Sequence, residues 1–503
     1  MRPDEGSDVS SEQPAPLLNL SVSGDVASSV REDTSYQGVL GGKTIGWLGS
    51  FALVVNNITG PGMLHLAIVF QKAGLIVPLV VFGIICVSST GAAQLLCDAI
   101  ARMPGNASLG VRQEFSDTFS HYLGRCSFSA SQVLFFMAIF TQTVASIVGT
   151  AQSMDGLIVL LCKRTWALEV FAMQGVAWSP ESYCGTHAGN SECVPFSSFD
   201  GAPQIGCIIT AGYVATLVLM APLGFWNLDD NIKFQIMSFF VLLILSMEFI
   251  VEMIANHGLE PSRVPWFGDD YSSVLGTIMF NFAYCPTIPS WLNEKKPDVN
   301  VGKVLWTSAF TATVMYIFVG LLSAMSFRHA EGNVLETLSA GHVWTITKVS
   351  AFLFGLLVVG LGIPVFCVVM RYNLFVGGIC SQRTATLLGV VMPWALSWLL
   401  YQGRAAEVFV SASGVVLISL VGFLGPLLVA LAAAGGFLTS ERGRQGCLGR
   451  LRRMWARAPD LGVSCCPALP QHWQHLQRRY VSILLVVLVP MVLAGLILQL
   501  SQL

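Results

Sequence analysis

The sequence predicts an all-α, polytopic membrane protein with about eleven transmembrane helices. Of its 503 residues, 54% are hydrophobic and only 11% are charged, whereas a soluble protein carries about 25% charged residues. The mean hydropathy is +0.66. The apolar residues recur in blocks of about 20, the length with which a helix crosses a bilayer. These observations exclude a secreted enzyme and a repeat solenoid, and the net charge of −2 gives no sign of a nucleic-acid partner.

The chain divides into a polar tail and an apolar body. Residues 1–43 are rich in Ser, Asp and Glu and contain no apolar core of a cleavable signal peptide. We expect them to be a disordered cytosolic tail. Residues 44–503 are predicted to form the transmembrane domain.

Each predicted span is a long apolar segment between polar or charged connections. The eleven spans are 46–71, 75–101, 128–153, 205–223, 232–254, 272–292, 303–326, 343–370, 385–402, 406–436 and 480–500.

The basic residues in the connections predict the orientation of the chain. The loop 437–479 has only Glu441 and Asp460 as acidic residues. Since cytosolic loops carry the excess of Lys and Arg, this loop and the N-terminus are predicted to be cytosolic. The basic residues of the loop are Arg442, Arg444, Arg450, Arg452, Arg453, Arg457, Arg478 and Arg479.

The loop 154–204 becomes the largest segment on the opposite, non-cytosolic side. It contains Cys184 and Cys193, a candidate disulfide in an oxidising compartment. Two cysteines alone leave open whether this bond forms.

The first span is interrupted by the run from Asn56 to Gly62. Gly and Pro disfavour a helix interior by about 1 and 3 kcal/mol, and irregular backbone at membrane depth occurs where it lines a cavity or is buried in protein. We expect Pro61 to open a new half-helix with Thr59 or Gly60 as its N-cap. The free backbone N–H groups at the start of this half-helix would then bind a carboxylate.

The sixth span is interrupted at the corresponding position, where Pro286 and Pro289 lie three residues apart. Matched breaks in two halves indicate a transporter site, and five spans from one break to the other indicate a five-plus-five inverted repeat with one extra helix. The alternative is two structural kinks, because Gly and Pro are common in membrane helices.

The residues at both breaks resemble the amino acid/auxin permease family, the transmembrane amino acid transporters. The first-helix signature is matched by Asn57–Leu64 and Phe70–Gly74, and the sixth-helix signature by Phe282–Pro289 and Asn293–Pro297. Further matches are Ala221–Leu223, Arg371 and Gly425–Pro426. Covering 45–503, the resemblance implies a LeuT-type fold and secondary active transport of amino acids, usually driven by protons and in some branches by sodium. The sequence departs from the family pattern at Pro61, His65 and Ala67.

The substrate site is expected between the first and sixth helices. The substrate carboxylate would meet the backbone N–H groups of the first helix, and its amino group would meet carbonyls near Asn281 to Tyr284. Side chains of the breaks would add polarity or bound the substrate. The predicted substrate-binding residues are Asn57, Thr59, Gly60, Gly62, Met63, Phe280, Asn281 and Tyr284.

The coupling ion is expected to be a proton rather than sodium. In related folds a sodium site uses hydroxyls from the middle of the eighth helix, and residues 354–364 contain neither Ser nor Thr. Ionisable residues within spans cost free energy to bury in the membrane, so they are candidates for a functional role. His65 and Glu248 are the coupling candidates, whereas Glu252 is expected to reach water at the outer end of its helix.

An alternative function is an amino-acid sensor that signals through its cytosolic segments without net transport. An enzyme is not expected, because the sequence has no catalytic constellation; no cofactor or metal is expected either. The membrane is predicted to be the plasma membrane or that of a vacuolar or lysosomal organelle.

Overall fold

The computed structural model describes residues 41–59, 63, 65–170, 173–179, 208–327, 334–335, 338, 343–401, 414–434 and 464–500. The part from Gly41 onward forms one compact unit. It is mainly helical, which confirms the predicted fold class. Eight helical segments are long and apolar enough to cross a bilayer: Ile76–Ala101, Arg125–Cys162, Leu228–His257, Val301–Ser326, Thr345–Val376, Gln382–Leu400, Val416–Ala434 and His472–Ala494.

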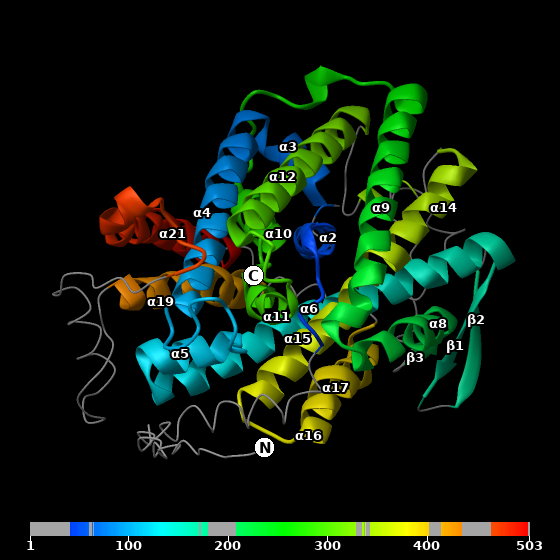
Figure 1. Ribbon diagram of the computed structural model, residues 1–503. Coiled ribbons are helices and arrows are strands. Elements are labelled where there is room, and N and C mark those ends of the chain that lie inside the picture. The colour runs from blue at the N-terminus through cyan, green and yellow to red at the C-terminus, as the bar shows by residue number, and fades with distance from the viewer. Residues whose placement is uncertain are drawn as a thin grey trace, which may run out of the picture. The chain divides into compact units, whose positions relative to one another are not determined.

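The first half of the unit contains both broken helices and a small sheet (Figure 1). Its elements are α2 (Trp47–Ile58), α3 (Leu66–Ala73), α4 (Ile76–Ala101), α5 (Phe115–Leu123), α6 (Arg125–Cys162), β1 (Thr165–Glu169), β2 (Gln174–Trp178), β3 (Ile208–Thr210), α8 (Ala211–Met220), η2 (Pro222–Phe225), α9 (Leu228–Glu252), η3 (Met253–His257), η4 (Pro261–Arg263), α10 (Ser272–Asn281), η5 (Cys285–Thr287) and α11 (Ile288–Glu294).

The second half contains several π-helical turns within its helices. Its elements are α12 (Val301–Ser326), α14 (Thr345–Phe354), η6 (Gly355–Val359), α15 (Gly362–Val376), α16 (Gln382–Thr386), η7 (Leu387–Val391), α17 (Met392–Ser397), η8 (Trp398–Leu400), η9 (Gly414–Leu424), α19 (Gly425–Ala434), η10 (Gln471–Leu476) and α21 (Gln477–Leu500).

Every predicted span contains helix in the structure, but the number of eleven crossings remains a prediction. Two boundaries differ clearly from the predicted ones. The predicted third span ends at 153, whereas α6 continues to Cys162. The predicted fourth span begins at 205, whereas residues 208–210 form strand β3 before α8 begins at Ala211.

A three-stranded antiparallel sheet in the order β2-β1-β3 lies beyond the end of α6. Ala167 of β1 pairs with Val176 of β2, and Leu168 pairs with Ile209 of β3. Figure 1 shows α6 running across the bundle from α5 to this sheet. The sequence analysis expected a loop here and missed the sheet.

Asp155 explains why α6 is longer than predicted. The carboxylate is fully buried in α6, and it accepts hydrogen bonds from Thr165 Oγ1 at 2.7 Å, Gly212 N at 2.9 Å and Tyr401 Oη at 2.5 Å. Thr210 Oγ1 is a fourth donor. Because buried charge is tolerated when it is fully hydrogen-bonded, the helix continues past an acidic residue. The same carboxylate joins α6 to β1, to α8 and to Tyr401.

The last helix, α21, is hydrogen-bonded to α4 through a second buried acidic residue, Asp98. Asp98 near the end of α4 pairs with Arg102 at 3.0 Å. The same carboxylate accepts a 2.6 Å hydrogen bond from Gln477 Nε2 at the start of α21. The helix that follows the basic loop is thereby placed against α4.

Asp155→Ala is predicted to lower the thermal unfolding temperature of the purified protein in detergent. The substitution leaves four buried donors unpaired, and each unsatisfied group costs about 1–3 kcal/mol. Glu260→Ala is the matched control, because Glu260 is exposed and pairs only with Arg263. An unfolding temperature that falls equally in both variants would contradict the role assigned to Asp155.

Candidate functional site

The first broken helix leaves its regular geometry where the sequence predicts. Helix α2 ends at Ile58, and α3 begins at Leu66. Thr59 closes α2, because its N–H and its Oγ1 both donate to the carbonyl of Val55, at 2.7 and 2.8 Å. The broken first span is therefore present.

The start of the second half-helix differs from the prediction. His65 is the N-cap of α3, so the assignment of that role to Thr59 or Gly60, with Pro61 at the first turn, is wrong. The physical reason is that the hydrogen bonds of Thr59 tie it to the helix before it, where it serves as a C-cap. Gly60, Pro61 and Gly62 lie outside the described residues.

The sixth span is broken at the matching place. Helix α10 ends at Asn281, a 3-10 turn covers Cys285–Thr287, and α11 begins at Ile288. Pro286 and Pro289 stand at the starts of this turn and of α11, where a missing N–H costs least.

Side chains from neighbouring helices satisfy the backbone groups that the breaks release. Tyr316 of α12 donates its hydroxyl to the carbonyl of Ile58 and lies 3.4 Å from the carbonyl of Asn281. Ser89 of α4 donates to the carbonyl of Phe282 at 2.9 Å. The two breaks are therefore held next to each other by α12 and α4.

Asn57 joins the breaks directly. Its Nδ2 donates to Thr287 Oγ1 at 3.0 Å, and Thr287 Oγ1 donates to the carbonyl of Tyr284 at 2.8 Å. The carbonyls of Phe282 and Tyr284 thus each accept a hydrogen bond from a side chain. A carbonyl oxygen has two lone pairs, so the expectation that the substrate amino group meets the carbonyls near Asn281 to Tyr284 stays a prediction.

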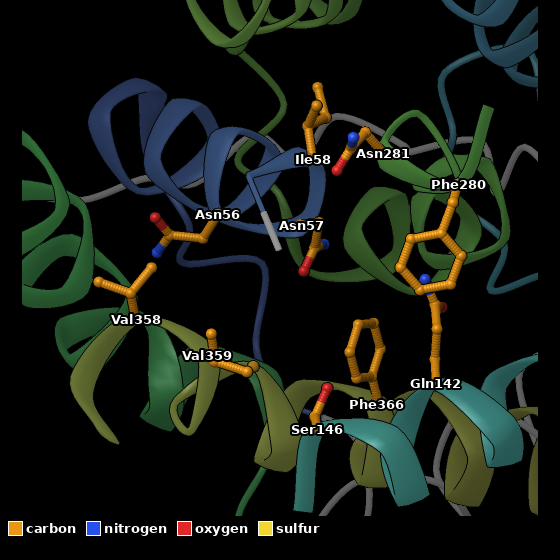
Figure 2. A pocket seen from close by; sticks show the side chains of 11 residues that line it. Asn56, Asn57, Ile58, Gln142, Ser146, Phe280, Asn281, Val358, Val359 and Phe366 are labelled. Atoms are coloured by element: carbon orange, nitrogen blue, oxygen red, sulfur yellow. The ribbon is translucent and has the colours of Figure 1, made fainter. Parts of the chain in front are cut away.

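A small cavity lies where the two breaks face α6, η6 and α15. Its volume is about 30 Å³, room for about two water molecules. Figure 2 shows Asn57, Phe280 and Phe366 around the same space. The lining residues are Asn56, Asn57, Ile58, Gln142, Ser146, Phe280, Asn281, Val358, Val359, Gly362 and Phe366.

The cavity is lined by both polar and apolar residues, none of them charged. The side-chain oxygens of two lining residues, Asn56 Oδ1 and Asn281 Oδ1, are buried and have no hydrogen-bond partner in the described structure. Buried polar atoms without partners are rare in native proteins. An unsatisfied pair in one cavity therefore marks a place for a hydrogen-bond donor.

Gln235 of α9 is a component of the site that the sequence analysis missed. Asn56 Nδ2 donates to the backbone carbonyl and to Oε1 of Gln235, at 2.8 and 3.0 Å. Gln235 Nε2 donates to the carbonyl of Leu361 at 2.7 Å, in the irregular stretch between η6 and α15. A glutamine within an apolar span was the available signal, because a polar group there needs partners.

The predicted substrate residues divide into three groups. Asn57, Phe280 and Asn281 line the cavity. Thr59, Met63 and Tyr284 are buried but are not among the lining residues. Gly60 and Gly62 lie outside the described residues.

The coupling candidates lie apart from the cavity lining. The side chain of His65 is exposed at the start of α3. Glu248 of α9 accepts a 2.6 Å hydrogen bond from Thr347 Oγ1 of α14, and its Oε2 is buried without a partner in the described structure. Glu252 is fully buried, so the expectation that it reaches water is wrong: Asn256 and Thr347 hydrogen-bond it within the protein.

The disulfide and metal predictions are not decided by the geometry. Cys184 and Cys193 lie outside the described residues, and the nine cysteines within them carry free thiols. The described residues contain no group of His, Cys, Asp or Glu suited to hold a metal.

A family model for transmembrane amino acid transporter proteins matches residues 43–376, well over half of the chain. The chain belongs to the transmembrane amino acid transporter family. The predicted family is thereby confirmed, and the chain is a multi-pass membrane protein of a transporter family. A comparison with curated proteins gives no match.

Solved structures of transporters share the fold. MhsT in complex with L-phenylalanine aligns with a TM-score of 0.59 at 12% identity, covering 89% of this chain and 98% of MhsT. Mhp1, a nucleobase-cation-symport-1 family transporter, aligns in a closed conformation with a TM-score of 0.54 at 14% identity, covering 91% of each chain. In its inward-facing conformation the TM-score is 0.51 at 15% identity, covering 91% of this chain and 89% of Mhp1. The predicted LeuT-type fold is confirmed.

Gln235→Leu is predicted to reduce amino acid uptake at least about tenfold in cells or proteoliposomes. The variant fills a similar volume but removes the amide bridge between α2 and Leu361, and lost hydrogen bonds of this kind are worth about 1 kcal/mol or more each. Lys233→Ala, an exposed change two residues away, is the control. Full uptake by Gln235→Leu at equal surface expression would refute this role.

Proposed function

We propose that this protein is a proton-coupled secondary transporter of amino acids that works by alternating access, with its substrate site between the broken helices. The observation that carries the proposal is the cavity at the facing breaks, with its unpartnered Asn56 and Asn281 oxygens. An ammonium group has three donors and no acceptor. Each of these buried amide oxygens is an acceptor that such a donor group could satisfy.

The substrate carboxylate is assigned to the opposite end of the site. The proposed donors are the backbone N–H groups of Gly60, Gly62 and Met63, in the chain between α2 and α3. Backbone N–H groups near a helix start favour an anion. An α-amino acid carries both groups on one carbon, so one substrate molecule would engage both ends of the proposed site.

The lining favours an amino acid with a neutral side chain. None of the eleven lining residues is charged, and a buried charge without a partner is strongly disfavoured. Phe280 and Phe366 would bound the side chain. With room for about two waters, the cavity must widen before a substrate enters, in keeping with a cycle in which the site opens to each side in turn.

Glu248 is the proposed proton carrier. Thr347 Oγ1 lies 2.6 Å from Glu248 Oε1 and 3.3 Å from Glu252 Oε2. Acidic residues within spans are candidates for proton transfer, and Glu248 Oε2 is buried without a hydrogen-bond partner in the described structure. His65 is a second candidate proton carrier, because a histidine side chain can change its charge near neutral pH.

Asn281→Leu and Gly62→Val test the two ends of the proposed substrate pose. Each is predicted to reduce uptake of a neutral amino acid by about tenfold or more, since removal of a partner from a charged group costs about 1.5–3 kcal/mol. Inhibition of uptake by a primary amine that lacks the carboxylate distinguishes the two ends of the site. This inhibition should be lost in Asn281→Leu and kept in Gly62→Val. Unchanged uptake by Gly62→Val would place the carboxylate elsewhere.

Uptake of a labelled amino acid panel into proteoliposomes is predicted to follow an imposed pH gradient and to ignore sodium. Glu248→Gln should abolish the response to the gradient while exchange of substrate continues, because the glutamine cannot carry a proton. Asp270→Asn, an exposed acid paired with Lys72, is the control. Dependence on sodium would overturn the proton assignment, and binding without flux under any gradient would favour the alternative of a sensor.

A further inference from the structure

A short strap, residues 41–46, closes the face of the domain that is predicted to be cytosolic. The strap is paired with the end of α11 as a parallel bridge between Ile45 and Lys295. Ile45 N donates to the carbonyl of Glu294 at 3.1 Å, and Lys296 N donates to the carbonyl of Ile45 at 2.9 Å. Beneath it, Trp291 Nε1 donates to Ser50 Oγ at 2.9 Å, with both residues buried.

Two carboxyl groups hold the strap. Glu294 accepts from Gly41 N at 3.2 Å and from Asp229 N at 2.7 Å, while Asp229 accepts from Gly42 N at 3.1 Å. A Cβ added at Gly41 would lie 2.1 Å from Asp229 Oδ1 and 2.6 Å from Glu294 Oε2. The carboxyl groups of Asp229 and Glu294 therefore both pack against Gly41 and lie close to each other.

A third carboxyl, Glu114, contacts the same turn of α11 that carries Glu294. It is buried before the first turn of α5 and accepts from Ser290 Oγ at 2.8 Å and Asn293 Nδ2 at 2.7 Å. Asp117 on α5 receives the Glu114 N–H at 3.0 Å. Glu114 therefore links the connection after α4 to the helix that carries the strap.

No ion pair neutralises these buried acids in the described part of the chain. The nearby cations contact carbonyls instead: Arg112 bonds Gly41, Lys43 bonds Leu109, and Lys295 bonds Lys296 and Val299.

Burial raises the pKa values of Glu114 and Glu294. Burial raises the pKa of Glu114 to about 8; hydrogen bonds from Ser290 and Asn293 oppose the rise, and repulsion from Asp117 and Glu294 adds to it. Burial raises the pKa of Glu294 to about 7; hydrogen bonds from Tyr372, Asp229 N and Gly41 N oppose the rise, and repulsion from Asp229 adds to it. Both groups therefore titrate near neutral pH while the strap is closed.

We propose that the strap is a proton-dependent latch, closed while Glu114 and Glu294 are protonated and released when they ionise. Opening of this face would hydrate both carboxyls and return them to ordinary acidity. Below the pKa values that Glu294 and Glu114 have in the closed state, their bound protons favour that state. This stabilisation is lost as the pH rises through about 7 and 8. Acidification on this face keeps the pathway shut.

The latch differs from the coupling site proposed above. Its carboxyls lie at the cytosolic end of α11 and in the connection before α5, away from the Glu248 pair on α9. It goes beyond the proposed function, because it regulates opening whichever ion drives transport.

Reaction of a buried cysteine tests the latch without substrate or ion gradient. Ser50 is buried one helical turn after the strap and accepts a hydrogen bond from Trp291 of α11, so in the full-length Ser50→Cys protein the thiol is expected to become accessible when the strap leaves α11. An impermeant maleimide is added to inside-out vesicles with equal pH on both sides, and labelling is measured by peptide mass spectrometry. The exposed Cys126, beside Arg125 at the start of α6, corrects for the reactivity of thiols at each pH.

Labelling of Cys at position 50 relative to Cys126 should rise about tenfold or more from pH 6 to pH 8.5, because each pH unit changes the weight of a protonated state tenfold. In the Glu114→Gln, Glu294→Gln double variant the rise should fall below about twofold. Asp229→Asn removes repulsion from Glu294 and should shift the midpoint to lower pH. Glu260→Gln, an exposed acid, should behave as the parent.

A ratio independent of pH in the parent would overturn the latch, and so would a full rise in the double variant. A midpoint unmoved or raised by Asp229→Asn would also overturn it, and that variant keeps every hydrogen-bond acceptor that the strap uses. Since no transport is measured, failure here is distinct from failure of proton coupling.

Discussion

The structure depends on one constraint: backbone groups released at membrane depth must find partners within the protein. The two broken helices release such groups side by side. Tyr316, Ser89 and Thr287 satisfy the carbonyls that the breaks expose, and Gln235 ties the first break to Leu361. These bonds fix where the breaks lie, and so they fix where a cavity can exist.

The groups that remain unsatisfied give the cavity its chemistry. Most polar atoms around the breaks are paired, so the two free amide oxygens of Asn56 and Asn281 are conspicuous against that background. Their burial makes an unpaired state costly, which gives binding of a donor a favourable free energy. Under the proposed function, a lining without charged residues and with two aromatic rings would favour a substrate with a neutral side chain.

Ionisable groups are placed toward the ends of the domain rather than around the cavity. Asp155 joins the sheet to α6, while Glu114 and Glu294 lie at the face closed by the strap. Each is buried and hydrogen-bonded, but of the three only Glu294 bonds the strap, through Gly41 N, while Glu114 bonds Ser290 and Asn293 of α11. The proposed latch assigns control of accessibility to these two glutamates, whereas Asp155 is assigned to stability.

The sequence alone determined the fold class, the family and the positions of both breaks, because apolar length, Gly and Pro act locally and are visible without neighbours. It also identified Asn57, Phe280 and Asn281 at the cavity. It could not determine the N-cap of α3, the burial of Glu252, the sheet after α6 or the bridge made by Gln235. Those depend on partners far away in the chain, such as Thr347 for Glu252 and Asn56 for Gln235, and only the tertiary structure brings such partners within hydrogen-bonding distance.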